Sequence, residues 1–134
     1  MNPVVHFEMP YDDAQRISRF YQSVFGWKLQ APGADMGNYV LATSAEQDAM
    51  PEGKGWRGAI NGGFFPRRAD MPGQHPSVVI AVPDIQAAMK AVQKAGGEVL
   101  GTPMEIPGVG QYVAFHDTER NRLSMLQPLP MQGG

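Results

Sequence analysis

The sequence predicts an α+β fold in which tandem βαβββ modules form a curved mixed sheet that encloses a cup-shaped cavity. Two observations support this prediction: the first half of the chain matches the second, and each half places one helical pattern among short strand patterns. The 134 residues fit a single domain, with module one at about 3–68 and module two at about 74–129.

The repeat is visible when the sequence is shifted by 71 positions, with no gap over the first segment. The matching pairs are Asp13 with Asp84, Gln22 with Gln93, Gly26 with Gly97, Leu29 with Leu100 and Pro32 with Pro103. Five identities in register, together with the same order of elements, are not expected from chance.

In the first half, an apolar strand is predicted over residues 4–9 and a helix over residues 14–25. Asp12 or Asp13 can cap this helix, because a carboxylate accepts hydrogen bonds from the amides of the first turn. Gly26 can end it in the left-handed conformation. A second strand then starts at Trp27. The apolar face of the predicted helix over residues 14–25 consists of Ile17, Phe20, Tyr21 and Val24.

The second half repeats these elements, with a strand over residues 77–82, a cap at Asp84 and a helix over residues 85–94 that ends at Gly96-Gly97. Two further strands complete each module. Residues 38–41 resemble 111–114 at an offset of 73, and residues 59–65 resemble 121–127 at an offset of 62. The offset falls because module one has a longer loop at about 43–57, as is typical of a lid or binding loop.

Composition narrows the possible functions. A formal net charge of −2 gives no electrostatic basis for binding nucleic acid or an anionic membrane. No apolar run approaches the roughly 18 residues of a membrane span, and the first residues do not resemble a signal peptide. The chain has no cysteine, which excludes disulfides and thiolate chemistry. We therefore expect a cytoplasmic protein.

Several motifs follow one another in an order that resembles a known superfamily. They are His6-Phe7-Glu8-Met9-Pro10, Phe20-Tyr21, Phe25-Gly26-Trp27, Ile60-Asn61-Gly62-Gly63, Gly96-Gly97, Pro107-Gly108-Val109-Gly110 and His116-Asp117-Thr118-Glu119-Arg120-Asn121-Arg122. Over nearly the whole chain, this series resembles the vicinal oxygen chelate (glyoxalase / bleomycin-resistance / extradiol dioxygenase) superfamily, and within it a glyoxalase-like bacterial branch. The last motif resembles a frequent Asp-Pro-Glu-Gly-Asn ending, from which Thr118 and Arg120 depart.

The resemblance implies a test for a metal centre, because the superfamily takes one ligand from the first strand and one from the fourth strand of each module. These positions fall on His6 and Ser77, and on Gly62 and Ser124. Only His6 is a suitable ligand. We therefore expect no cofactor of the usual family type, and a divalent metal is disfavoured.

Two roles for the residues around His6 remain open. Glu8 lies two positions later on the same strand face, so His6, Glu8 and His75 form a weak alternative metal set. Without metal, His6 and Glu8 are candidate catalytic residues, with His6 a general base whose pKa the carboxylate is expected to raise. The competing interpretation is a hydrogen-bonded polar pair that shapes the cavity floor.

The cavity wall is predicted to include aromatic and methionine side chains, which bind flat or apolar ligands well. The candidates for this ligand pocket are Tyr39, Trp56, Phe64, Met104, Tyr112, Ser77 and Ser124. Ordinary core packing is the alternative for each aromatic residue taken singly.

These observations leave three hypotheses for function. The first is a small-molecule-handling glyoxalase-like protein, a lyase or isomerase on an unidentified metabolite if it is an enzyme. The second is a non-catalytic binding or sequestration protein of the bleomycin-resistance type. The third is a metal-dependent lyase or dioxygenase with a non-standard ligand set. The resemblance also implies a homodimer, and neither nucleic acid nor a membrane is an expected partner.

Overall fold

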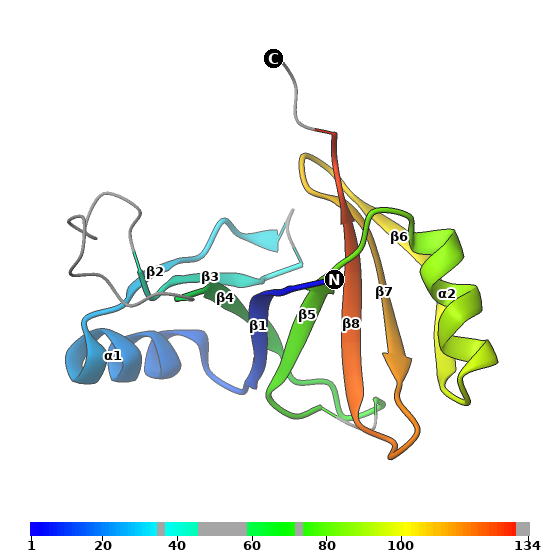
Figure 1. Ribbon diagram of the computed structural model, residues 1–134. Coiled ribbons are helices and arrows are strands. Elements are labelled where there is room, and N and C mark those ends of the chain that lie inside the picture. Colours follow the sequence, from blue (N-terminus) through cyan, green and yellow to red (C-terminus); the bar gives the residue numbers. More distant parts are fainter. Residues whose placement is uncertain (35–36, 46–58, 72–73, 131–134) are drawn as a thin grey trace. The chain divides into compact units, whose positions relative to one another are not determined.

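The protein is described by a computed structural model that covers residues 1–34, 37–45, 59–71 and 74–130 (Figure 1). It forms two compact units. The N-terminal unit is His6–Pro76, and the C-terminal unit is Met1–Val5 together with Ser77–Gly134. The first residues join the second unit because the Ala81 amide donates a hydrogen bond to the Pro3 carbonyl at 2.9 Å. Trp56 and most of the predicted long loop lie outside the described residues.

The N-terminal unit is a βαβββ module. Its elements are β1 (Val4–Tyr11), α1 (Ala14–Phe25), β2 (Lys28–Gln30), β3 (Val40–Thr43) and β4 (Asn61–Pro66). The first two residues of β1 belong to the C-terminal unit. The strand order is β2-β3-β4-β1, in which β1 and β4 are parallel and the other pairs antiparallel. Helix α1 packs on one face of this sheet.

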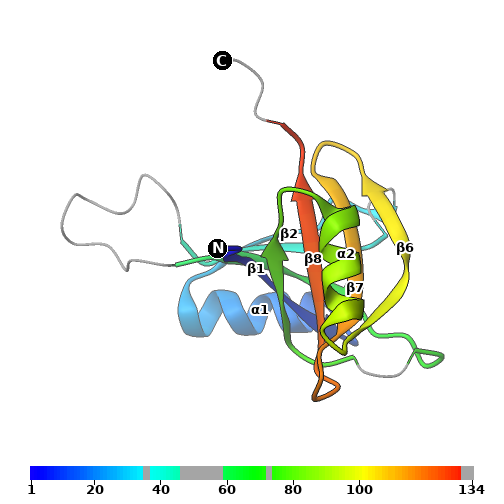
Figure 2. The ribbon, with the colours of Figure 1, turned by 45° about the vertical axis from the view of Figure 1, so that its right-hand side comes forward.

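The C-terminal unit repeats the same pattern (Figure 2). Its elements are β5 (Ser77–Ala81), α2 (Ile85–Lys94), β6 (Glu98–Ile106), β7 (Gly110–His116) and β8 (Arg122–Pro128). The strand order is β5-β8-β7-β6, with β5 and β8 parallel. Two βαβββ modules with mixed strand pairing confirm the predicted α+β class. The cup between the modules stays a prediction.

Both helices begin and end where the sequence predicts. The Asp13 carboxylate accepts a hydrogen bond from the Arg16 amide, and Asp84 accepts from the amides of Gln86 and Ala87. Gly26 ends α1 with a φ of 73°, which a side chain would resist. In the described part of the chain, neither helix is long and apolar enough to cross a membrane.

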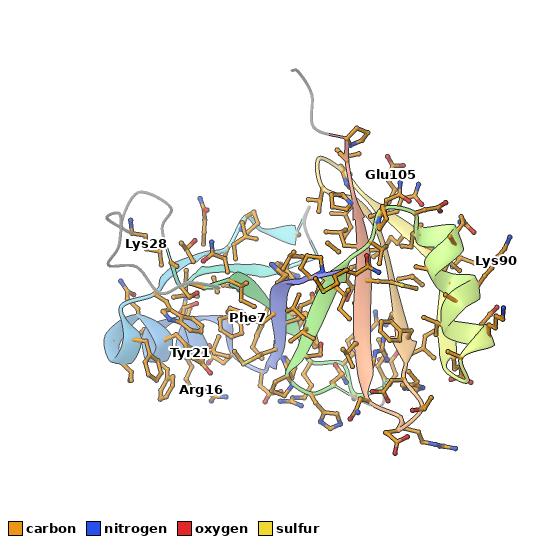
Figure 3. All side chains as sticks on the ribbon, in the orientation of Figure 1. Phe7, Arg16, Tyr21, Lys28, Lys90 and Glu105 are labelled. Atoms are coloured by element: carbon orange, nitrogen blue, oxygen red, sulfur yellow. The ribbon has the colours of Figure 1, made fainter. Side chains whose placement is uncertain are left out.

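Each unit has its own hydrophobic core between helix and sheet. In the N-terminal unit, Phe7 of β1 and Tyr21 of α1 lie between the two elements (Figure 3). Buried Val40, Ala42 and Phe64 complete that core from the sheet side. In the C-terminal unit the buried residues are Val82, Ile85, Val113, Phe115 and Met125.

Strand β3 begins at Val40, two residues after the predicted start at residue 38. Asn38 adopts a φ of 59°, and its amide donates to the Gly33 carbonyl at 3.2 Å. Asparagine tolerates this left-handed conformation better than most residues. The chain is therefore still turning where the strand was expected, and Tyr39 lies just before the strand.

The turn between β7 and β8 is organised by Asp117. Its carboxylate accepts hydrogen bonds from the Asn121 side chain, the Asn121 amide and the Glu119 amide, at 2.8–2.9 Å. The Asn121 side chain is the main reason that the pKa of Asp117 lies below its usual value. Arg120 closes the turn with a φ of 64°, at the position where the family motif has glycine.

We expect Arg120→Gly to stabilise the protein. The left-handed conformation costs a non-glycine residue about 1–2 kcal/mol, and glycine loses about 0.5–1 kcal/mol of that gain through its freer unfolded chain. The net gain in the free energy of unfolding is about 0.5–1 kcal/mol, measured by urea denaturation. Arg122→Gly, in strand β8, is the control and should destabilise. Equal destabilisation by both substitutions would contradict this account of the turn.

Candidate functional site

The two faces of the N-terminal sheet carry different side chains. Phe7 and Met9 pack in the core against α1, so the alternation of a strand directs His6 and Glu8 to the opposite face. We call this the far face; in both units it is the face opposite the helix. Gly63 pairs with Glu8 on one side and with Leu41 on the other, so Gly63 and Leu41 lie on the far face as well.

Among the residues that the structure describes, His6 has one close polar partner on this face. Its Nε2 lies 2.8 Å from the Tyr39 hydroxyl oxygen, within hydrogen-bond distance. The two rings are nearly parallel, with an interplanar angle of 19°. Both residues are half-buried. The structure thus joins one candidate catalytic residue, His6, to one candidate pocket residue, Tyr39.

The Tyr39 ring lies directly over Gly63 of β4. A Cβ atom built on Gly63 would overlap two carbon atoms of that ring and the Tyr39 hydroxyl oxygen. On the other side of the same strand, a Cβ on Gly62 would overlap the Phe7 ring and carbonyl. Each glycine therefore gives up its side-chain space to an aromatic residue, one on each face of the sheet.

The electrostatics of His6 differ from the expectation. Burial lowers the pKa of His6, since a charged ring loses hydration there, and this outweighs the opposing effect of Glu8. The prediction that Glu8 raises the pKa above its usual value was wrong. The sequence showed the neighbouring carboxylate but not the depth at which the ring lies.

The C-terminal unit carries a related arrangement on its own far face. Ser124 is buried, and its hydroxyl donates to the Tyr112 hydroxyl oxygen at 2.6 Å. Ser77 lies on this face too, because Val79, two residues along β5, pairs with Ser124. Met104 pairs with Tyr112 and is exposed.

The strand register corrects two sequence assignments. The sequence offset of 62 predicts Gly62 as the fourth-strand equivalent of Ser124, but Gly62 pairs with Phe7 and faces the helix. Gly63 is the equivalent residue, because it pairs with Leu41 as Ser124 pairs with Ala114. Phe64, predicted in the pocket wall, is fully buried in the core, where its ring centroid lies 5.2 Å from that of Tyr21.

The residues present do not fit the metal centre of the superfamily. With the corrected register, the four ligand positions hold His6, Ser77, Gly63 and Ser124, so they supply one strong ligand. His75 is exposed in a bend. Among the residues that the structure describes, no three histidine, cysteine or acidic side chains come together as a possible metal site, so His6, Glu8 and His75 do not form one.

A depression of about 410 Å³ lies elsewhere on the N-terminal unit, between the end of β1 and the first half of α1. None of the predicted site residues that the structure describes lines it. Its acidic groups already have structural partners: Asp12 accepts from Arg67 at 3.1 Å, and Asp13 caps the helix. We therefore place the candidate site at His6 and Tyr39 and not at this depression.

Sequence reasoning missed Gly63. A glycine inside a strand gives up packing and conformational entropy, and it often marks a place where another group approaches the backbone closely. The pair Gly62-Gly63 was therefore an available signal. What it could not show was which aromatic ring approaches each glycine, because Tyr39 comes from a distant part of the chain.

Comparison with known proteins agrees with this fold. The model of the "Glyoxalase/Bleomycin resistance protein/Dioxygenase superfamily" matches residues 4–125. A "Glyoxylase-like domain-containing protein" of Didymella fabae is 32% identical over 117 residues, covering 85% of this chain and 84% of that protein. The chain belongs to the Glyoxalase/Bleomycin resistance protein/Dioxygenase superfamily.

Other similar proteins are more distant or longer. "Anthracycline biosynthesis protein DnrV" of Streptomyces peucetius is 30% identical over 119 residues, which make up 83% of this chain and 42% of that protein. The chain thus spans less than half of that relative. The crystal structure of methylmalonyl-CoA epimerase from Mycobacterium tuberculosis superposes with a TM-score of 0.66 at 13% identity, covering 95% of this chain and 88% of the epimerase. At this identity the likeness concerns the fold alone.

We predict that acid destabilises the folded protein through His6. In the unfolded chain the pKa of His6 is about 6.5, whereas its pKa in the folded protein is lower. Between these two values the unfolded state binds more protons, so the free energy of unfolding falls as pH drops below about 6.5. Urea denaturation between about pH 7.5 and pH 5 measures this fall.

His6→Asn is the matched variant, because asparagine is polar but does not titrate in this range. Its stability should depend less on pH than that of the unaltered protein over the same interval. Identical pH dependence in the two proteins would contradict the assignment of a lowered pKa to His6.

Proposed function

We propose that this protein is a glyoxalase-like enzyme that acts on a small molecule without the family's metal centre, as a lyase or isomerase. The observation that carries the proposal is the hydrogen-bond contact between His6 Nε2 and the Tyr39 hydroxyl on the far face of the N-terminal sheet. A lowered pKa keeps the His6 ring neutral near pH 7, and a neutral imidazole can accept a proton.

His6 and Tyr39 have different roles in this proposal: His6 accepts the proton, and Tyr39 orients the His6 ring. A neutral imidazole has one N–H and one lone pair, and the partner of one nitrogen fixes the state of the other. When Nε2 donates to the Tyr39 oxygen, the lone pair is on Nδ1, which becomes the proton acceptor. Glu8 favours the charged ring electrostatically, so it stabilises the imidazolium that forms after proton transfer.

This chemistry suits substrates with an acidic C–H bond, such as one next to a carbonyl group. Removal of that proton followed by its return is an isomerisation, and loss of a neighbouring group instead is a lyase reaction. The fold is shared with methylmalonyl-CoA epimerase, whose name describes a reaction of the first kind. We extend only this class of reaction to the chain, not the substrate of that enzyme.

Solvent deuterium tests the proposal before the natural substrate is known. Carbonyl metabolites are incubated with the protein in deuterium oxide, and incorporation of deuterium at carbon is followed by mass spectrometry. We expect incorporation with at least one compound, and a fall of roughly 10²–10⁴-fold in its rate in His6→Ala. The control is His116→Ala, which removes a surface histidine that lies 3.2 Å from Glu98. Equal rates in His6→Ala and the unaltered protein would overturn the proposal.

A second candidate function is ligand sequestration, as in the bleomycin-resistance type. Two observations favour it: the half-buried far face carries an aromatic residue, Tyr39, of the kind that binds planar ligands, and the relative DnrV is named for anthracycline biosynthesis. Titration with an anthracycline, followed by its fluorescence, tests this function. Tight binding that leaves the ligand chemically unchanged, and that survives His6→Ala but not Tyr39→Ala, supports sequestration over catalysis.

The metal-dependent alternative has a separate test. Elemental analysis of protein purified without chelator should give a metal content far below one equivalent. A near-stoichiometric metal that is lost in His6→Ala would support the non-standard ligand set instead. A homodimer and a cytoplasmic location stay predictions, and light scattering measures the first.

A further inference from the structure

The glycine pair of β4 is the motif that the proposed function leaves unexplained. Gly62 and Gly63 lie inside a strand and both are buried. Neither adopts the left-handed conformation that favours glycine. The backbone therefore accepts other residues at both positions, and the requirement for glycine must come from the space beside it.

The two glycines serve different faces. Gly62 admits the Phe7 ring, which belongs to the core against α1. Gly63 admits the Tyr39 ring, whose hydroxyl meets His6. Only the second contact involves the candidate site, so the functional question concerns Gly63.

The C-terminal unit provides an internal comparison. Tyr112 corresponds to Tyr39, and Ser124 corresponds to Gly63 in the strand register. Where the strand carries serine, its hydroxyl donates to the tyrosine oxygen at 2.6 Å. Where it carries glycine, the tyrosine oxygen lies 2.8 Å from a histidine on the neighbouring strand. The residue beneath the tyrosine thus differs together with the tyrosine's partner.

We propose that Gly63 is a positioning residue for His6, because its missing side chain lets the Tyr39 ring cross β4 and hold its hydroxyl against His6 Nε2. The inference rests on the proposed function only in treating His6 as the reacting group; the positioning itself can be measured without a substrate.

Three variants separate the steps of this argument. Gly63→Ala adds one Cβ in the space of the Tyr39 ring. Gly63→Ser reproduces the arrangement of the C-terminal unit, and its hydroxyl should take the Tyr39 oxygen away from His6. Tyr39→Phe removes only the hydroxyl and adds no atom, so it tests the hydrogen bond even if the Gly63 variants fold poorly.

The primary readout is the His6 ring in nitrogen-15 NMR spectra recorded against pH. The chain has three histidines, and the His6 signals are those missing in His6→Ala. Displacing Tyr39 re-exposes the ring to water, so in Gly63→Ala and Gly63→Ser its pKa should rise toward about 6.5. Glu8 acts in the same direction, and it remains on the strand in every variant. The tautomer of the neutral ring should also become mixed, in Tyr39→Phe as well.

A double-mutant comparison distinguishes positioning from a general loss of packing. If the added Cβ acts only by displacing the Tyr39 ring, Gly63→Ala should lower the melting temperature in the unaltered protein but not in a Tyr39→Ala background. In the Tyr39→Ala background, Gly63→Ala should cause no further change in the pKa of His6.

The possible outcomes are distinct. A His6 pKa and tautomer that are unchanged in Gly63→Ala and in Tyr39→Phe would overturn the positioning role, whatever the activity. Changes as predicted, with deuterium incorporation intact in His6→Ala, would uphold the positioning and reject His6 as the base. Loss of melting temperature by the same amount in both backgrounds would show that the Cβ acts elsewhere than on Tyr39.

Discussion

The close approach of two aromatic rings to the glycines of β4 is the constraint on which the site depends. A strand interior does not favour glycine, because glycine loses the most conformational freedom on folding and offers no side chain to pack. Here the lost packing is replaced by Phe7 on one face and Tyr39 on the other. The first contact belongs to the core and the second brings a hydroxyl to His6. Adjacent residues of one short strand therefore serve different purposes: Gly62 makes room for the core, and Gly63 makes room for the candidate site.

The two units show how one scaffold can carry different polar groups. Both keep the βαβββ order, an aspartate cap on the helix and a tyrosine on the far face. They differ at the first strand, where His6 corresponds to Ser77, and at the fourth, where Gly63 corresponds to Ser124. A histidine has a pKa close enough to neutral to exchange protons, whereas two serine hydroxyls do not. The proposed chemistry is accordingly assigned to the N-terminal unit, although the tyrosine is present in both.

The sequence predicted the fold well because its signals are local. Asp13 and Gly26 mark the ends of α1, and the offset of 71 residues transfers the aspartate cap to Asp84 at the start of α2. Helix α2 ends at Lys94, just before Gly96-Gly97. It predicted the site less well, because the site depends on register and depth. A register error of one residue exchanged Gly62 for Gly63 and with it the face of the sheet. The same limitation placed Phe64 in the pocket wall and reversed the direction of the His6 pKa.

The state of the His6 ring in the unaltered protein tests the account most directly. A long-range hydrogen–nitrogen NMR spectrum near pH 7.5 reports which ring nitrogen carries hydrogen. The account predicts a neutral ring with the hydrogen on Nε2, toward the Tyr39 oxygen. The nitrogen-15 chemical shift of Nδ1 should be that of an unprotonated ring nitrogen. A doubly protonated ring, or a neutral ring with its hydrogen on Nδ1, would contradict it.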